Sequence, residues 1–250
     1  GVANFMISGF SSVADSAFYN NTTITNVHIG NSVTSITDDA FRLATNLSSV
    51  SFELDSLLNN IGTRAFLYAT SLASIDIPDS VTTIGAGAFW DTTSLSSITF
   101  GVNSLLNNIG GSAFVNTALT SIAIPDSVLS IGDYAFSFAS NLSSITFGVN
   151  SQLAVNSQLA SIGVMAFRYN TALTTIAIPN TVTTIGVKAF EDSGLTTVSL
   201  TQNLTIASTT YAIDTTVASF FGSSNVVSFV RSTITINGVY YTIIAGTGQF

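Results

Sequence analysis

The dipeptide Ala-Phe recurs eight times at nearly regular intervals, and this period constrains the fold more than any other feature of the chain. The intervals are 23, 25, 23, 25, 22, 31 and 23 residues, between Phe18, Phe41, Phe66, Phe89, Phe114, Phe136, Phe167 and Phe190. Such a period indicates a repeat architecture, because a single unit of this size cannot bury its apolar face without stacking on its neighbours. We therefore expect a solenoid of stacked coils.

Two types of unit alternate along this array. Residues 72–89 read LASIDIPDSVTTIGAGAF, and residues 119–136 repeat the pattern as LTSIAIPDSVLSIGDYAF. Between them, residues 95–114 read LSSITFGVNSLLNNIGGSAF, which is the second and longer type. One unit of each type makes a super-repeat of about 47 residues.

Each unit predicts one short strand, a turn and a return towards the core. In LASIDI (72–77), apolar residues two apart indicate a strand with one buried face. Pro78 in one unit type and Gly101 in the other end this strand. Val81 and Ile84 are then expected to point inwards as the chain returns to the core. The strands of successive coils are expected to stack about 4.8 Å apart in a parallel sheet. A glycine after each return is expected to allow a tight bend; these residues are Gly62, Gly85, Gly110, Gly132, Gly163 and Gly186.

The interval of 31 residues contains a direct duplication, because VNSQLA occurs at 149–154 and again at 155–160. Without one copy, this interval has the 25 residues of the longer unit. The duplication is therefore interpreted as a tandem insertion between the strand that ends at Phe147 and the return at Ile162. We expect it to bulge outwards and to leave the register on both sides intact.

Both ends depart from the pattern, which divides the chain into three predicted parts. Residues 1–19 are a degenerate N-terminal cap coil, 20–200 are the repeat solenoid, and 201–250 are a degenerate last coil with a C-terminal β cap. Within the last part, TITINGVYYTI (233–243) predicts a β-hairpin, because Asn237-Gly238 suits a type I′ turn. Caps of this kind cover the apolar faces that terminal coils leave open.

Composition excludes several classes of function. The net charge is −8 with five Lys and Arg residues in all, so no basic face exists for nucleic acid. No apolar run reaches the length of about 20 residues that a transmembrane helix needs, and the opening GVANFMISGF is not an intact signal peptide. The absence of cysteine excludes disulfides and thiolate chemistry. Scarce lysine, an acidic balance and abundant Ser, Thr and Asn favour an extracellular setting.

The consensus L-x-x-I-x-I-P-x-x-V-x-x-I-G-x-x-A-F resembles the repeat of the BspA-like, or treponemal-type, leucine-rich repeat family over about residues 20–200. The resemblance implies a mainly β solenoid of leucine-rich-repeat coils of about 23–25 residues, at the cell surface or secreted, with roles in adhesion and protein binding. That family often carries a cysteine three residues after Ala-Phe. Here the slot holds Asn21, Ala44, Ala69, Thr92, Thr117, Ala139, Asn170 and Ser193.

The resemblance also implies a binding surface, because leucine-rich repeats generally bind partners on the outward face of their strands. We call this surface the strand face, and its candidate binding residues are Asn26, His28, Ser49, Ser51, Ser74, Asp76, Ser97, Thr99, Ser121, Ser144, Thr146, Thr175, Thr197 and Ser199, with Ala123 and Ala177 completing the rows. Interface hot spots are usually Trp, Tyr and Arg, and the strand face has none of them. The alternative is a solvated wall of small hydroxyl side chains.

A second candidate surface lies beside the Ala-Phe dipeptides. It combines aromatic and basic side chains that could contact a protein or a glycan: Tyr19, Tyr68, Trp90, Tyr134, Phe138 and Tyr169, with Arg42, Arg64, Arg168 and Lys188. The alternative is that these aromatic rings cover the ends of the core phenylalanines.

The residues show no enzyme signature, and neither a cofactor nor a metal ion is expected. His28, the only histidine, is expected on the surface of a strand, and a general base needs both a nucleophile and an orienting partner. The pairs Asp38/Asp39 and Glu53/Asp55 are interpreted as solvated turn carboxylates, because glycoside hydrolysis needs two carboxylates that face one cleft. The chain contains neither a calcium-loop nor a phosphate-loop motif.

Three functions remain, in order of preference. The first is a non-catalytic recognition or adhesion module that binds protein or glycan through the solenoid surface. The second is self-assembly of copies of the chain into a filament or surface coat, because open coil ends favour heterologous stacking. The third is ice or mineral-surface binding through the Ser and Thr rows, which His28, Asp76 and Ala123 interrupt.

Deletion of residues 155–160 is expected to leave the protein folded, because it restores a unit of ordinary length in which the remaining VNSQLA copy supplies the turn. Thermal unfolding followed by circular dichroism measures the effect. A melting temperature within a few degrees of the parent protein supports the insertion hypothesis. A large loss of thermal stability would show that the second copy is structural.

Overall fold

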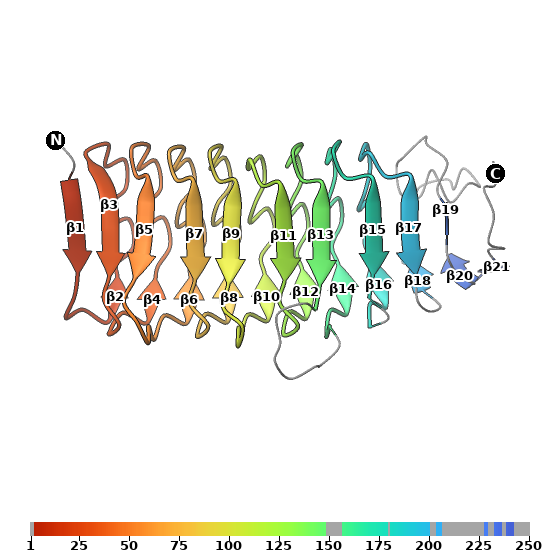
Figure 1. Cartoon of the computed structure of the whole chain (residues 1–250), viewed down its shortest axis with the longest axis horizontal. Helices are drawn as coiled ribbons and strands as arrows, with labels where there is room; N and C mark the ends of the chain where they lie inside the picture. Colours follow the sequence, from red (N-terminus) through yellow and green to blue (C-terminus); the bar gives the residue numbers. More distant parts are fainter. Residues whose placement is uncertain are drawn as a thin grey trace.

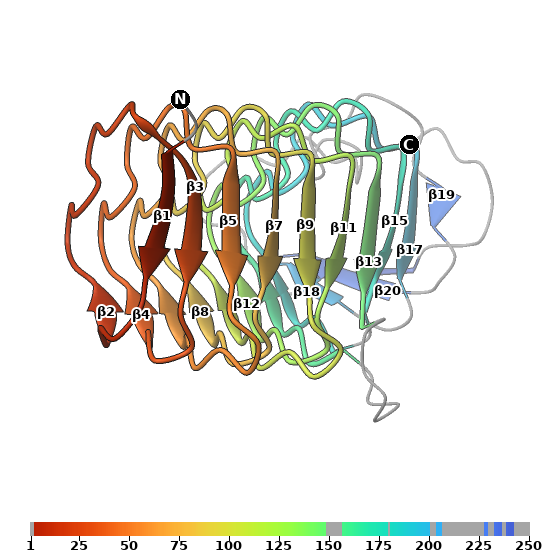
Figure 2. The ribbon, with the colours of Figure 1, turned by 60° about the vertical axis from the view of Figure 1, so that its left-hand side comes forward.

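The computed structural model describes residues 3–148, 157–179 and 181–200, together with four short strand segments at 204–206, 228–229, 233–236 and 239–242. The described chain winds into a β-solenoid in which each coil contributes a longer strand to one wall and a short strand to the other (Figure 1). Figure 2, turned by 60°, shows the two walls and the turns that connect them. The predicted mainly β solenoid is confirmed.

The longer strands form the front wall. They are β1 (Ala3–Ile7), β3 (Ile24–Ile29), β5 (Ser49–Phe52), β7 (Ser74–Ile77), β9 (Ser97–Phe100), β11 (Ser121–Ile124), β13 (Ser144–Phe147), β15 (Thr175–Ile178), β17 (Thr197–Leu200) and β19 (Ser228–Phe229). Burial alternates along them, as in the exposed–buried–exposed–buried pattern of β7 and β9, because period-2 side chains alternate between the core and solvent.

The short strands form the return wall, a single eleven-stranded sheet. They are β2 (Ser12–Val13), β4 (Ser35–Ile36), β6 (Asn60–Ile61), β8 (Thr83–Ile84), β10 (Asn108–Ile109), β12 (Ser130–Ile131), β14 (Ser161–Ile162), β16 (Thr184–Ile185), β18 (Leu204–Ile206), β20 (Thr233–Ile236) and β21 (Val239–Thr242). The described pairs are parallel except β20 with β21, whose antiparallel pairing confirms the two strands of the predicted hairpin. The proposed turn at Asn237-Gly238 lies outside the described residues.

The front wall, unlike the return wall, is interrupted at regular places. Hydrogen-bonded ladders join β1, β3 and β5, then β7 with β9, β11 with β13, and β15 with β17 and β19. Between these groups the strands remain neighbours without pairing, and Figure 1 shows β7 with β9 and β11 with β13 as close pairs. Each interruption follows a longer unit, whose turn after the strand has two extra residues. The alternation of unit types in the sequence therefore determines where the hydrogen-bonded ladder of the front wall is interrupted.

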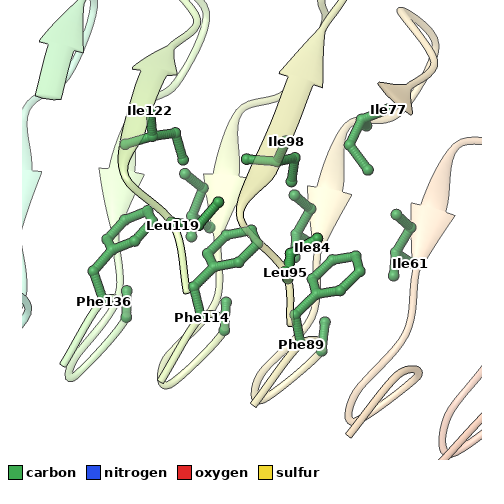
Figure 3. Packing of buried hydrophobic residues seen from close by; sticks show 14 of the residues in the cluster. Ile61, Ile77, Ile84, Phe89, Leu95, Ile98, Phe114, Leu119, Ile122 and Phe136 are labelled. Carbon is green, nitrogen blue, oxygen red and sulfur yellow. The ribbon is translucent and has the colours of Figure 1, made fainter. Parts of the chain in front are cut away.

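A column of phenylalanine rings runs through the core along the solenoid axis. The eight rings of the Ala-Phe dipeptides stack with centroids 5.0–5.3 Å apart and planes within 10° of parallel. All but Phe18 are fully buried, and Figure 3 shows Phe89, Phe114 and Phe136 in successive coils beneath the isoleucines of both walls. Phe5 closes the N-terminal end of the column, with its edge on Phe18 at 5.2 Å. The repeat period thus corresponds to one ring per coil.

The turn around each phenylalanine has an unusual backbone. The residues two before and two after each ring have positive φ, and only Gly87 among them is a glycine; the others are Ser16, Asn20, Asp39, Leu43, Arg64, Tyr68, Asp91, Ser112, Asn116, Tyr134, Phe138, Met165, Tyr169, Lys188 and Asp192. A non-glycine residue with positive φ is uncommon, and the fold places a pair in every coil. Their side chains project on both sides of the buried ring.

The six glycines that directly follow the short strands of the return wall have a different role from the one expected. None of the six has positive φ, so the prediction that they allow the bend is wrong. Instead, a Cβ at any of them would meet the backbone of the preceding coil, at 2.5 Å from Gly111 N for Gly132 and at 2.3 Å from Val164 N for Gly186. Glycine is required here because successive coils approach too closely for a side chain.

The duplicated segment is partly described. Residues 149–156, which include the predicted bulge, lie outside the described residues. On either side the coils are in register, since β13 pairs with β11 and β14 pairs with β12 without a shift. Leu159 from the second copy is fully buried, as Leu58 and Leu106 are in the other longer units. The expectation that register survives the insertion is confirmed.

Asn170 is a polar defect in the core. Its side chain is fully buried, and neither its amide nitrogen nor its amide oxygen has a hydrogen-bond partner. The same slot in other coils holds Ala44, Ala69 or Ala139, or a threonine such as Thr92, whose hydroxyl donates to Phe66 O at 3.0 Å. An unpartnered buried polar group costs about 1–3 kcal/mol.

The substitution Asn170→Ala is therefore expected to raise the free energy of unfolding by about 1–2 kcal/mol, because it removes two unpartnered polar groups and gives this slot the residue of the preceding coil, Ala139. Urea denaturation of the variant and the parent measures this difference. Thr92→Ala is the matched control and should lower stability, because it removes a hydroxyl that is bonded. Destabilisation by both substitutions would show that Asn170 fills necessary space.

Removal of one ring from the column is expected to be costly. Phe114→Ala should lower the free energy of unfolding by about 3–5 kcal/mol, since the ring is fully buried between two stacked neighbours. Phe138→Ala is the control, because this ring is 47% exposed on the turn and should cost much less. Similar losses for the two variants would contradict the role of the column.

Candidate functional site

The strand face is exposed along the front wall as predicted. The described candidate residues on β5, β7, β9, β11, β13 and β15 are exposed, and Asn26 and His28 on β3 are half-buried. Only the backbone is described for Thr197 and Ser199 on β17. Because the buried isoleucines between these residues are fixed in the core, the face presents its side chains from a rigid support. Whether this face binds a partner stays a prediction.

Hydrogen bonds tie neighbouring coils together across the strand face. Asn26 donates to Asn4 Oδ1 at 2.7 Å, and Thr99 donates its hydroxyl to Asp76 Oδ1. His28 Nδ1 lies 3.0 Å from Ser51 Oγ. A serine is thus within reach of the only histidine, but among the described residues no carboxylate bonds to His28 as the third member of a catalytic triad would.

A groove opens at one edge of the strand face, where β5, β7 and β9 end. Its volume is about 1010 Å³, and it is lined by residues from 50–56, 76–80 and 99–105. The carboxyl ends of these strands lie at the same edge of the front wall (Figure 1). Three predicted strand-face residues, Ser51, Asp76 and Thr99, belong to its wall. We call it the acidic groove, because four carboxylates line it and none of the lining residues is Lys, Arg or His.

The four carboxylates come from two coils and differ in their surroundings. Glu53 Oε2 accepts a hydrogen bond from the backbone N–H of Asn31 at 2.9 Å, and Asp76 accepts the Thr99 hydroxyl. Asp55 is exposed at a turn position with a φ of 57°. Together they give the groove a concentrated negative charge.

Asp79 has the most confined of these carboxylates. Its Oδ1 atom is buried and has no hydrogen-bond partner. The carboxylate lies over Gly101, where a Cβ would be only 1.7 Å from Oδ1. The glycine that begins the turn of the longer unit therefore provides the space that Asp79 occupies.

Apolar side chains accompany the charge. Leu54 is 84% exposed and Leu105 is 58% exposed, and both line the groove with Phe52, Ile77 and Phe100. Exposed leucines beside carboxylates make a surface that can contact both apolar and charged groups of one ligand. Sequence reasoning placed Asp76 on the strand face but missed this site, because it interpreted Glu53 and Asp55 as solvated turn carboxylates.

The aromatic surface beside the Ala-Phe turns is also exposed. Tyr19, Tyr68, Trp90, Tyr134 and Phe138 are 40–48% exposed, so they do not simply cover the core. The basic residues beside them are engaged with acidic neighbours. Arg64 bonds Asp39 at 2.8 Å, Arg168 bonds Glu191 at 2.7 Å, Arg42 lies 3.4 Å from Asp39 and Lys188 pairs with Glu191. Each of these four basic residues is thus paired with Asp39 or Glu191.

The described residues contain neither a metal-binding cluster nor a membrane-spanning helix. No group of three or more His, Cys, Asp or Glu side chains among them could hold a metal ion. The same part of the chain also contains no helix of the length and apolarity that a membrane crossing requires.

Comparisons with known proteins agree with this architecture. The profile of the BspA type leucine-rich repeat region matches residues 59–154 and 150–235, in six copies. The crystal structure of a Treponema pallidum leucine-rich repeat protein is similar, with 25% identity over 76% of each chain and a TM-score of 0.56.

Two further solved structures are more distant. A leucine-rich cell surface protein of Faecalibacterium prausnitzii has 20% identity over 93% of this chain and 89% of its own, with a TM-score of 0.46. The pneumococcal vaccine antigen PcpA has 16% identity over 85% and 80%, with a TM-score of 0.43. No curated protein sequence matches the chain.

Proposed function

Because the chain belongs to the BspA-type leucine-rich repeat family, we propose that it is a non-catalytic recognition module that binds a protein partner through its strand face. The observation that carries this proposal is the acidic groove, which opens on the edge of the strand face and shares Ser51, Asp76 and Thr99 with it. A flat polar face alone has few groups that supply binding energy. The groove adds exposed leucines and charge.

The geometry suits a protein rather than a small substrate. Stacking at about 4.8 Å per coil makes the eight coils from β3 to β17 about 40 Å long, which is comparable to the extent of an ordinary protein interface. The face is presented by strands whose other side is fixed in the core, so little conformational entropy is lost on binding. Extended solenoid surfaces are used in this way in repeat proteins generally.

We further propose that the protein acts at a cell surface or after secretion, in adhesion. The low content of charged residues, 7% of the chain, and the abundance of Ser, Thr and Asn support this setting. The His28–Ser51 pair carries no proposal of catalysis, because no carboxylate in the described part of the chain bonds to His28 to orient it.

A binding screen against purified extracellular proteins and a glycan array tests the function. The variant Ser121→Lys/Ser144→Lys/Thr175→Lys places three bulky cations on consecutive coils of the strand face. The control Asn59→Lys/Asn107→Lys/Thr183→Lys makes the same charge change on the return side. We expect a protein ligand whose affinity falls at least tenfold for the first variant and is unchanged for the control.

Equal binding by both variants, or binding to glycans alone, would contradict recognition of a protein through the strand face. Light scattering across a concentration series accompanies the screen. A persistent monomer supports the proposal, whereas growth into large species with no protein ligand would favour self-assembly instead.

A further inference from the structure

We propose that the acidic groove is the docking site for a basic segment of the partner protein, in which Lys or Arg residues alternate with apolar ones. This inference rests on the proposed function, since it names the chemistry of the partner at one part of the strand face. The groove has the size of a ligand site, because its volume of about 1010 Å³ lies at the upper end of the range for binding pockets.

The repeats themselves show that the charge of the groove is not needed for folding. In the next super-repeat, Gly101, Asn103 and Ala123 occupy the positions that correspond to Glu53, Asp55 and Asp76. Those coils stack with the same ring spacing, 5.1 Å between Phe114 and Phe136, as the coils of the groove, 5.1 Å between Phe66 and Phe89. Three of the four carboxylates are therefore particular to this groove and absent from its structural equivalent.

The charge of the groove is also not neutralised from within. The four described basic residues lie at the Ala-Phe turns, where they pair with Asp39 and Glu191. The groove has no cationic lining residue, and Asp79 Oδ1 is buried in it without a donor. A buried carboxylate oxygen that lacks a donor is unfavourable, and an ammonium or guanidinium group of a ligand supplies one.

The apolar lining distinguishes a peptide segment from a simple cation. Leu54 and Leu105 are exposed on the groove. A hydrated ion would bury neither side chain, whereas apolar groups of a peptide would remove both from water. The described carboxylates also do not converge in a group of three that could hold a metal ion. A segment with both basic and apolar side chains uses both features of the lining. Long Lys and Arg side chains additionally pack their methylene stems on apolar surface.

A labelled peptide that alternates Lys or Arg with Leu is the probe, titrated into the full chain and followed by fluorescence anisotropy at low salt. Two reference peptides carry Glu in place of the basic residues, or Ser in place of Leu. The variant Glu53→Gln/Asp55→Asn/Asp76→Ala removes three of the four carboxylates of the groove, and its second and third substitutions match Asn103 and Ala123 of the next super-repeat. The control Asp15→Asn/Asp91→Asn/Asp192→Asn changes the net charge equally, away from the groove.

We expect the basic peptide to bind the parent protein and to lose about tenfold in affinity with the groove variant, as three weakened ion pairs predict. The control variant should bind as the parent does, both reference peptides should bind more weakly, and added salt should weaken binding. If the triple variant fails to fold, Asp55→Asn alone, at an exposed turn, should still lower the affinity about twofold.

Equal losses with the groove and control variants would overturn the inference, because they would reflect net charge alone. So would equal binding of all three peptides, or binding of Ca²⁺ without the basic peptide. A protein ligand that still depends on the strand face but ignores the groove variant would overturn this inference while leaving the proposed function standing.

Discussion

The stacking of one phenylalanine on the next is the interaction on which the rest of the solenoid depends. Rings at 5.0–5.3 Å, nearly parallel, set one spacing for all the coils between Phe18 and Phe190. At that spacing the return strands form one continuous ladder, and the coil backbones approach so closely that Gly132 and Gly186 cannot carry a side chain. The residues two positions before and after each ring have positive φ, and this left-handed backbone conformation is the free-energy cost of placing the ring in the column.

The two walls respond differently to this common spacing. The return wall has strands of nearly uniform length and remains paired throughout its described part. The front wall follows turns of alternating length, and its ladder is interrupted after each longer unit. The acidic groove lies at one of these places, between β5 and β7 and onto β9. The alternation that distinguishes the two unit types therefore also coincides with this concave surface.

Charge is divided between the two sides of the solenoid. On the side of the Ala-Phe turns, Arg42 and Arg64 pair with Asp39, and Arg168 and Lys188 pair with Glu191. At the edge of the strand face, four carboxylates stand without a cation. A protein with so few charged residues keeps a net negative field over this edge, and such a field steers a basic partner towards the groove during encounter.

The sequence by itself determined the solenoid, because a period of 23–25 residues with one Ala-Phe per unit can bury its apolar residues only by stacking. It also located the strands of the front wall, the antiparallel pair at 233–242 and the exposed rows of the strand face, but it predicted only a return where the short strands of the return wall lie. It did not reveal why glycine follows each return, because close approach is a distance between coils. Nor did it reveal the groove, because Glu53 and Asp76 are distant along the chain and only the stacking of neighbouring coils brings them to one edge.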